Sequence, residues 1–275
     1  MSYQTLMVHL QLGHSNVAVL QAAKQIAQRT NAAVIGIAVG FQTQLVYGKS
    51  FAMVDYFDRE LAHLEEKLTT EETLFRATFE DCAKTVEWRS IISMEPVADF
   101  IVAQARSADL IVTGVAASDF YNTYNSAHAS EIVMQSGRPV LAVPITGKQF
   151  KLENILIGWK DTREARRVIV DALPLLKMAT QVTVLEIASK DDKDETTERL
   201  NQVVVWLKSH GISAEPLVSI SKDTDAVEFL TIAKKQQADI VIIGAYGHSR
   251  FREWVLSGVT NELLRDAHFC AFLSH

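Results

Sequence analysis

Apolar residues along the chain fall into two alternating patterns, one typical of strands and one typical of helices. Strand-sized runs rich in Val, Ile and Leu resemble strands buried on both faces of a parallel sheet, and the segments between them repeat apolar residues at helical spacing. The runs predict strands at about 4–10, 33–39, 86–92, 108–114, 139–144, 154–160, 181–188, 214–220, 238–244 and 270–274. The segments between them predict helices at about 15–30, 53–83, 96–106, 126–136, 163–178, 194–209, 223–236 and 252–266.

The chain contains an internal repeat with a period of about half its length. ADLIVTG at 108–114 matches ADIVIIG at 238–244, and each run ends in a glycine that leads into a loop. LMVHL at 6–10 matches ILIGW at 155–159, and each is followed by a polar turn and an amphipathic helix. The repeat predicts two tandem α/β domains. Because strands alternate with helices, each domain is expected to be a doubly wound, five-stranded parallel sheet with helices on both faces.

A polar turn, Thr-Gly-Lys at 146–148, separates the two copies. We therefore expect a first domain at 1–146 and a second domain at 150–275. Both are of ordinary size for a domain with its own core.

Composition and charge narrow the class of protein. Of the 275 residues, 48% are hydrophobic and 22% are charged, which excludes a disordered or fibrous chain. The net charge of −6 argues against a nucleic-acid partner, because binding to phosphates needs a basic face. The apolar runs are far shorter than the roughly 20 residues of a membrane span, and the N-terminus does not resemble a signal peptide. Cys82 and Cys270 form no CxxC pair, so we expect a cytoplasmic setting without membrane contact.

A segment rich in glycine and hydroxyl residues, GAYGHSRFREWVLSGVT at 244–260, follows the fourth strand of the second copy. Ligands of open α/β sheets bind outside the carboxyl ends of the strands, near the reversal of strand order. Gly244 and Gly247 let the backbone approach a ligand, and amides at a following helix N-terminus can hold an anion. The segment predicts either a phosphate-binding loop or a tight strand-to-helix turn, and the spacing alone does not decide between them.

This segment, together with GRPVLAVP at 137–144 and WKDTREA at 159–165, resembles the universal stress protein family in its tandem two-domain form. The resemblance covers essentially the whole chain. It implies the family's adenine nucleotide alpha hydrolase-like fold and a role in the stress response. It also implies that ATP or another adenine nucleotide, with Mg, binds through a Gly-x2-Gly-x9-Gly-Ser/Thr motif that holds the ribose and phosphates.

Carried onto this chain, the resemblance places the nucleotide in the second domain. The first two motif glycines are present, but the third falls on Ser257, whose Cβ stands where the family's backbone approaches a phosphate. Lys160 replaces the family's aspartate after the first strand, and we expect it either to neutralise phosphate charge or to be a solvated surface lysine. The resemblance implies that the backbone of Ile187 holds the adenine edge; the alternative is a plain core isoleucine. The expected nucleotide-binding residues are Lys160, Asp161, Ile187, Gly244, Gly247, His248, Ser257, Gly258, Val259 and Thr260.

The first domain lacks this motif. Gly114 is kept, but Ala117 and Ala127 replace the next two glycines and Gln11 replaces the aspartate, so methyl groups crowd the phosphate position. We expect this half to be a structural copy or to hold a different ligand. The sequence contains no GxSxG nucleophile motif and no His or Cys pair at metal-ligand spacing, so we assign no catalytic and no metal-binding residue.

These features predict a cytoplasmic, non-enzymatic stress-response protein that responds to an adenine nucleotide and acts on unidentified protein partners. Two alternatives stay open: a slow ATPase or phosphotransfer enzyme at the same loop, and a ligand-free dimerisation scaffold. The enzyme is less favoured, because phosphoryl transfer needs a positioned metal and nucleophile-orienting groups. In the family, the last strands of two domains pair. We therefore expect Val140–Val143 and Ala271–Leu273 to pair within this chain, and the full-length protein to form a homodimer.

Overall fold

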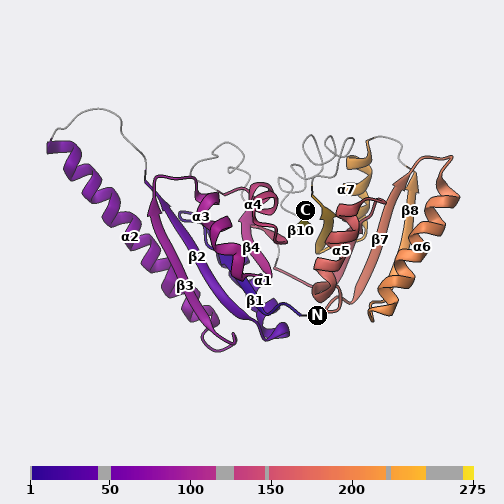
Figure 1. Cartoon of the computed structure of the whole chain (residues 1–275), viewed down its shortest axis with the longest axis horizontal. Coiled ribbons are helices and arrows are strands. Elements are labelled where there is room, and N and C mark those ends of the chain that lie inside the picture. The colour runs from indigo at the N-terminus through magenta and orange to yellow at the C-terminus, as the bar shows by residue number, and fades with distance from the viewer. Residues whose placement is uncertain (1, 43–50, 116–126, 146–148, 221–223, 246–268) are drawn as a thin grey trace.

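The computed structural model describes residues 2–42, 51–115, 127–145, 149–220, 224–245 and 269–275, and within these ranges strands and helices alternate along the chain (Figure 1). The strands are β1 (Thr5–His9), β2 (Ala33–Phe41), β3 (Val86–Ser93), β4 (Leu110–Val115), β5 (Val140–Pro144), β6 (Asn154–Gly158), β7 (Gln181–Ala188), β8 (Ala214–Ile220), β9 (Ile240–Gly244) and β10 (Cys270–Ser274). The helices are α1 (Val17–Thr30), α2 (Phe51–Phe79), α3 (Val97–Gln104), the 3-10 turn η1 (Ala105–Ser107), α4 (Ala129–Ser136), α5 (Arg163–Leu176), α6 (Lys193–Ser209) and α7 (Asp225–Lys235).

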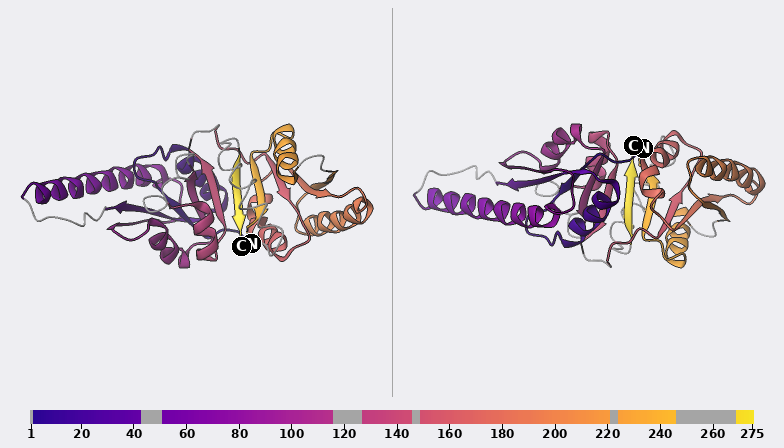
Figure 2. Two further views of the ribbon diagram at one scale, coloured as in Figure 1. Left: turned by 90° about the horizontal axis from the view of Figure 1, so that it is seen from above. Right: turned by 90° about the horizontal axis from the view of Figure 1, so that it is seen from below.

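These strands form one sheet in the order β3-β2-β1-β4-β5-β10-β9-β6-β7-β8. Neighbours within β1–β5, which we call the first half, are parallel, and so are neighbours within β6–β10, the second half. The halves meet where β5 and β10 pair antiparallel, with Ala142 opposite Ala271, at the centre of the molecule (Figure 2). The expected doubly wound parallel sheets are confirmed, as is the pairing of the two last strands within the chain.

The predicted element boundaries lie within two residues of the observed ones, with two exceptions. Helix α4 begins at Ala129 rather than 126, and α2 ends at Phe79 rather than 83. The predicted helix at 252–266 lies outside the described residues.

Helix α2 is longer than the sheet it covers. Leu68, Phe75 and Phe79 are buried against the sheet, and Phe75 packs on Trp88 of β3 with ring centroids 5.5 Å apart. The N-terminal turns of the helix project past the ends of β2 and β3 (Figure 1). Leu61 has the same helical spacing as these buried residues, yet it is 37% exposed.

Helices cover both faces of the sheet, as expected for a doubly wound fold. Buried side chains of α1, α2, α5 and α6 share one apolar core with one face of the strands. Those of α3, α4 and α7 share a second core with the opposite face. Each core contains residues of both halves, so the halves are joined by packing as well as by the β5–β10 ladder.

The two aspartates of the sequence repeat have the same structural role. Asp109 Oδ2 accepts hydrogen bonds from the backbone N–H groups of Gln4 at 2.7 Å and Thr5 at 3.0 Å. Asp239 Oδ2 accepts the corresponding bonds from the residues that precede and begin β6, at 3.1 and 2.9 Å. Each aspartate therefore ties the start of the first strand in its half to the strand beside it.

A polar contact around α5 also joins the halves. The Tyr3 hydroxyl donates to the backbone carbonyl of Asp171 at 2.8 Å, and the Ser274 hydroxyl lies 2.5 Å from the Asp171 carboxylate. Among the described residues, none of the helices has the length and apolar character needed to cross a membrane.

Candidate functional site

The reversal of strand order in the second half lies between β6 and β9. From β6 the chain passes through α5 to β7 on one side, whereas β9 pairs with β6 on the other side. Crevices at such a reversal bind the ligands of open α/β sheets, at the carboxyl ends of the strands. Gly158, the last residue of β6, pairs with Leu185 of β7 and Ile243 of β9. The residues that follow these three positions therefore share one edge of the sheet.

Four of the expected nucleotide-binding residues lie at this edge: Lys160, Asp161, Ile187 and Gly244. The other six, Gly247, His248, Ser257, Gly258, Val259 and Thr260, lie outside the described residues. The geometry thus brings the described part of the predicted set together, although β6, β7 and β9 are far apart in the sequence.

Lys160 and Asp161 occupy the exposed turn between β6 and α5. The turn is closed by a bond from the Thr162 N–H to the Lys160 carbonyl, 2.6 Å long, and the Thr162 hydroxyl caps the helix by accepting from the Ala165 N–H at 3.3 Å. The Asp161 carboxylate is 2.5 Å from Nη2 of Arg166, one turn into the helix. A ligand at this edge would therefore meet a lysine ammonium beside an already paired carboxylate.

Gly244 is required by the packing of β9 against α5. A Cβ built at this position would lie 2.8 Å from the carbonyl carbon of Glu164 and 3.0 Å from the backbone nitrogen of Ala165. These are backbone atoms of the first helical turn, which cannot move aside as a side chain does. The close approach at this glycine is to the protein's own helix, which explains Gly244 structurally. The expected phosphate contacts of the segment after it stay a prediction.

The equivalent edge of the first half is filled by its own side chains. Gln11, at the position of Lys160, is only 5% exposed, and its Nε2 donates to the Gly114 carbonyl at 3.3 Å. Asn16 accepts from the Gln11 N–H at 3.0 Å and donates to its carbonyl at 3.1 Å and to Glu71 Oε2 at 3.0 Å. The expectation that the first half lacks the nucleotide site stays a prediction.

A buried histidine distinguishes the first half from the second. His9 stands at the end of β1, where the second half has Gly158, and its Nδ1 is 2.8 Å from the Thr113 hydroxyl. Burial lowers the pKa of His9 to about 4, so its imidazole is neutral at pH 7. In the second half, Phe229 of α7 takes the space beside Gly158, and a Cβ there would lie 2.9 Å from its ring.

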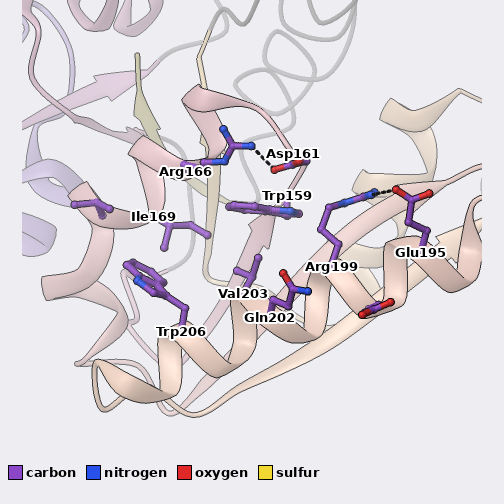
Figure 3. A pocket seen from close by; sticks show the side chains of 11 residues that line it. Trp159, Asp161, Arg166, Ile169, Glu195, Arg199, Gln202, Val203 and Trp206 are labelled. Carbon is purple, nitrogen blue, oxygen red and sulfur yellow. Dashed lines mark hydrogen bonds and ion pairs between the residues drawn. The ribbon is translucent and has the colours of Figure 1, made fainter.

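A second feature, which no sequence motif indicated, is an open groove of about 750 Å³ between α5 and α6 (Figure 3). We call it the α5–α6 groove. The Trp159 indole lies between Asp161 and Arg166 on one side and Val203 on the other. Farther along, Trp206 forms part of the wall.

A buried ion pair lies at the side of this groove. Glu186 of β7 is 5% exposed, and its Oε1 accepts from Nη2 of Arg199 at 2.8 Å. Burial raises the pKa of Glu186, while the Arg199 guanidinium opposes the rise. Within the described part of the chain, Glu186 Oε2, Arg199 Nε and Trp159 Nε1 have no hydrogen-bond partner. No group of three or more His, Cys, Asp or Glu side chains suited to a metal ion occurs among the described residues.

No protein-family model matches the sequence, and no curated protein matches it. Solved structures do match the fold. A universal stress protein from Archaeoglobus fulgidus DSM 4304 superimposes with a TM-score of 0.75 and 13% identity, over 98% of this chain and 95% of the other. A putative universal stress protein from Pseudomonas aeruginosa UCBPP-PA14 superimposes with a TM-score of 0.61 and 12% identity, over 99% of this chain and 93% of the other. A functionally unknown protein from Pseudomonas aeruginosa PAO1 has a TM-score of 0.59 and 14% identity, over 99% of this chain and 92% of the other. Over essentially its whole length, the chain has the fold of a universal stress protein.

Proposed function

We propose that this chain is a tandem universal stress protein that binds an adenine nucleotide at the β6–β9 edge of its second half. One observation carries the proposal: Lys160, Asp161, Ile187 and Gly244, expected from the family motif, lie at the reversal of strand order. The full-length likeness of fold supports the family assignment.

The two halves differ in a way that favours one nucleotide per chain. The second half presents the exposed Lys160 where the first has the buried, internally bonded Gln11. An exposed ammonium group attracts phosphate oxygens, whereas the Gln11 amide is uncharged and buried. The glycine and hydroxyl residues at 247–260 would complete the site around ATP or a related nucleotide, with Mg held by its phosphates.

The role that fits these features best is that of a non-enzymatic, cytoplasmic stress-response factor, whose contacts with protein partners or with a second copy depend on the bound nucleotide. The two alternatives differ in measurable properties. A slow ATPase or phosphotransferase turns the nucleotide over, and a ligand-free scaffold does not bind it.

Native mass spectrometry of freshly purified protein, followed by calorimetry with ATP, ADP and AMP, tests the proposal. We expect one nucleotide per chain. Lys160→Gln, which installs the side chain of the first half, should weaken ATP binding about five- to tenfold and AMP binding less, because AMP lacks the distal phosphates.

Lys177→Gln is the matched control, because Lys177 is an exposed lysine at the other end of α5. It should leave both affinities unchanged. Absence of binding for all three nucleotides contradicts the proposed function, and two equivalent sites contradict the assignment to the second half. Phosphate release from bound ATP would favour the enzyme.

A further inference from the structure

The α5–α6 groove has the size and walls of a small-molecule site. Its volume of about 750 Å³ lies within the range of about 300–1,000 Å³ typical of ligand pockets. Trp159, Ile169, Val203 and Trp206 form its apolar and aromatic lining, and of these Trp159 and Ile169 are buried. Trp206 packs on His210 with ring centroids 4.4 Å apart, yet it is still 37% exposed, a large share for a tryptophan side chain.

The groove lies on the opposite face of the sheet from the helix that follows β8. Trp159 and Glu186 belong to the face covered by α5 and α6, because Trp159 shares the core of Val168 and Leu200 and Glu186 bonds Arg199 of α6. The Ile187 side chain packs with the core of α7 on the other face. The groove is therefore distinct from the edge assigned to the nucleotide, although Asp161 lies where the two come closest.

Acidic groups outnumber basic groups around the groove. Asp161, Glu195 and Glu198 line it with Arg166 and Arg199, so three carboxylates stand against two guanidinium groups.

Both guanidinium groups are already engaged by carboxylates. Arg166 pairs with Asp161 at 2.5 Å, and Arg199 pairs with Glu186 at 2.8 Å and with Glu195 at 3.5 Å. Glu198 has no ion-pair partner among the described residues, and Glu186 Oε2 has no hydrogen-bond partner there. Among the described residues at the groove, the buried polar atoms without a hydrogen-bond partner are two donors, Arg199 Nε and Trp159 Nε1, and one acceptor, Glu186 Oε2, so they favour neither a cationic nor an anionic ligand. The excess of carboxylates favours a cationic ligand.

We propose that the α5–α6 groove binds a small organic cation: a protonated amine carried on a flat or aromatic apolar body. The apolar body would lie against the exposed part of the Trp206 indole, and the ammonium group would lie among the carboxylates of Glu195 and Glu198. Aromatic rings attract cations through their quadrupole, so the exposed Trp206 favours the same charge as the acidic groups do.

Three ligands of nearly equal size test the proposal with the full-length protein at low ionic strength. These are 2-phenylethylamine, 2-phenylethanol and 3-phenylpropionate, which present a cation, a neutral hydroxyl and an anion on the same ring. Titration by ligand-observed NMR should give a Kd of about 0.1–1 mM for the amine. The alcohol should bind at least about tenfold more weakly, and the carboxylate should show no saturable binding. Added salt should weaken only the amine, because screening acts on charges.

Glu198→Gln should reduce the affinity for the amine about two- to fivefold and leave that for the alcohol unchanged. Trp206→Leu should weaken both ligands. Asp194→Asn is the matched control, because Asp194 is an exposed acid on α6 that does not line the groove. Thermal melting curves for each variant show that the fold is intact.

Equal affinities for the amine and the alcohol would overturn the proposal in favour of an apolar groove without charge preference. Tighter binding of the carboxylate would show that the arginines dominate, and absence of binding by all three would show that the groove is not a ligand site. Each of these outcomes is independent of whether a nucleotide binds at the β6–β9 edge.

Discussion

The stability of the protein should fall in mildly acidic solution because His9 is buried without charge. Its folded-state pKa is about 4, against an ordinary value of about 6.5, and burial is the cause. The unfolded chain therefore binds a proton at this residue below about pH 6.5, while the folded chain does not until about pH 4. Because the unfolded state binds more protons in this window, lowering the pH favours unfolding.

The size of the effect follows from these two pKa values. Between about pH 7.5 and about pH 5, this one histidine should remove about 2 kcal/mol from the free energy of unfolding. His9→Asn is the informative variant, because its amide can still bond the Thr113 hydroxyl but does not titrate. The variant is expected to be less stable at neutral pH, since a smaller side chain leaves a cavity.

The comparison between the two proteins isolates His9. Urea denaturation, followed by circular dichroism at several pH values, gives the free energy of unfolding of each. All other titrating groups are common to both, so the wild type should lose about 2 kcal/mol more than the variant over this range. Parallel pH profiles would refute the reasoning and show that His9 is solvated or charged in the folded protein.

Three further predictions concern packing, hydrogen bonding and assembly. Gly244→Ala should lower the stability by about 1–3 kcal/mol, and by more than Gly114→Ala does, because the new methyl group meets helix backbone at 244 and side chains at 114. Equal losses of stability in thermal melts would contradict this. Asp239→Ala should lower the free energy of unfolding by about 1–3 kcal/mol, and Asp109→Ala by the same amount within about 0.5 kcal/mol, since each removes the acceptor of two backbone N–H groups. Clearly unequal losses in urea denaturation would show that the two aspartates do not contribute equally to stability. An isolated fragment at 150–275 should self-associate through its uncovered β10 edge, and a stable monomer at high concentration in the ultracentrifuge would refute this.

The elements and their order could be predicted from the sequence because each depends on a local pattern. The strands at 110–115 and 240–244 are buried along their whole length, so their continuous apolar runs predict buried strands without knowledge of the strands beside them. The apolar stripe of α2 could also be predicted from the sequence. Which residues of the stripe are buried could not. Leu61 has the same spacing as the buried positions, yet it is exposed, because burial depends on what packs against each turn of the helix.

The candidate sites show the same division between local and long-range information. The meeting of Lys160, Asp161, Ile187 and Gly244 was foreseen from the family motif, whose residues lie at strand ends. The reason why a glycine is needed at position 244 could not be foreseen, because it depends on how closely α5 approaches β9.

The α5–α6 groove could not be foreseen at all. Trp159 follows β6, Glu186 lies in β7 and Arg199 lies in α6, and neither their spacing nor their types form a motif. Only the register of β6 with β7 and the position of α6 above them bring the three side chains together.

The antiparallel ladder between β5 and β10 makes the two halves one energetic unit. If either half opened alone, the other would expose the backbone N–H and C=O groups of its last strand and the shared parts of both cores. Local opening at the joint is therefore about as costly as global unfolding, and amide hydrogens of β4 and β5 should exchange with solvent as slowly as those of β9 and β10. A ligand that binds only the second half would then slow the exchange of amides in the first, although no atom of the ligand touches it.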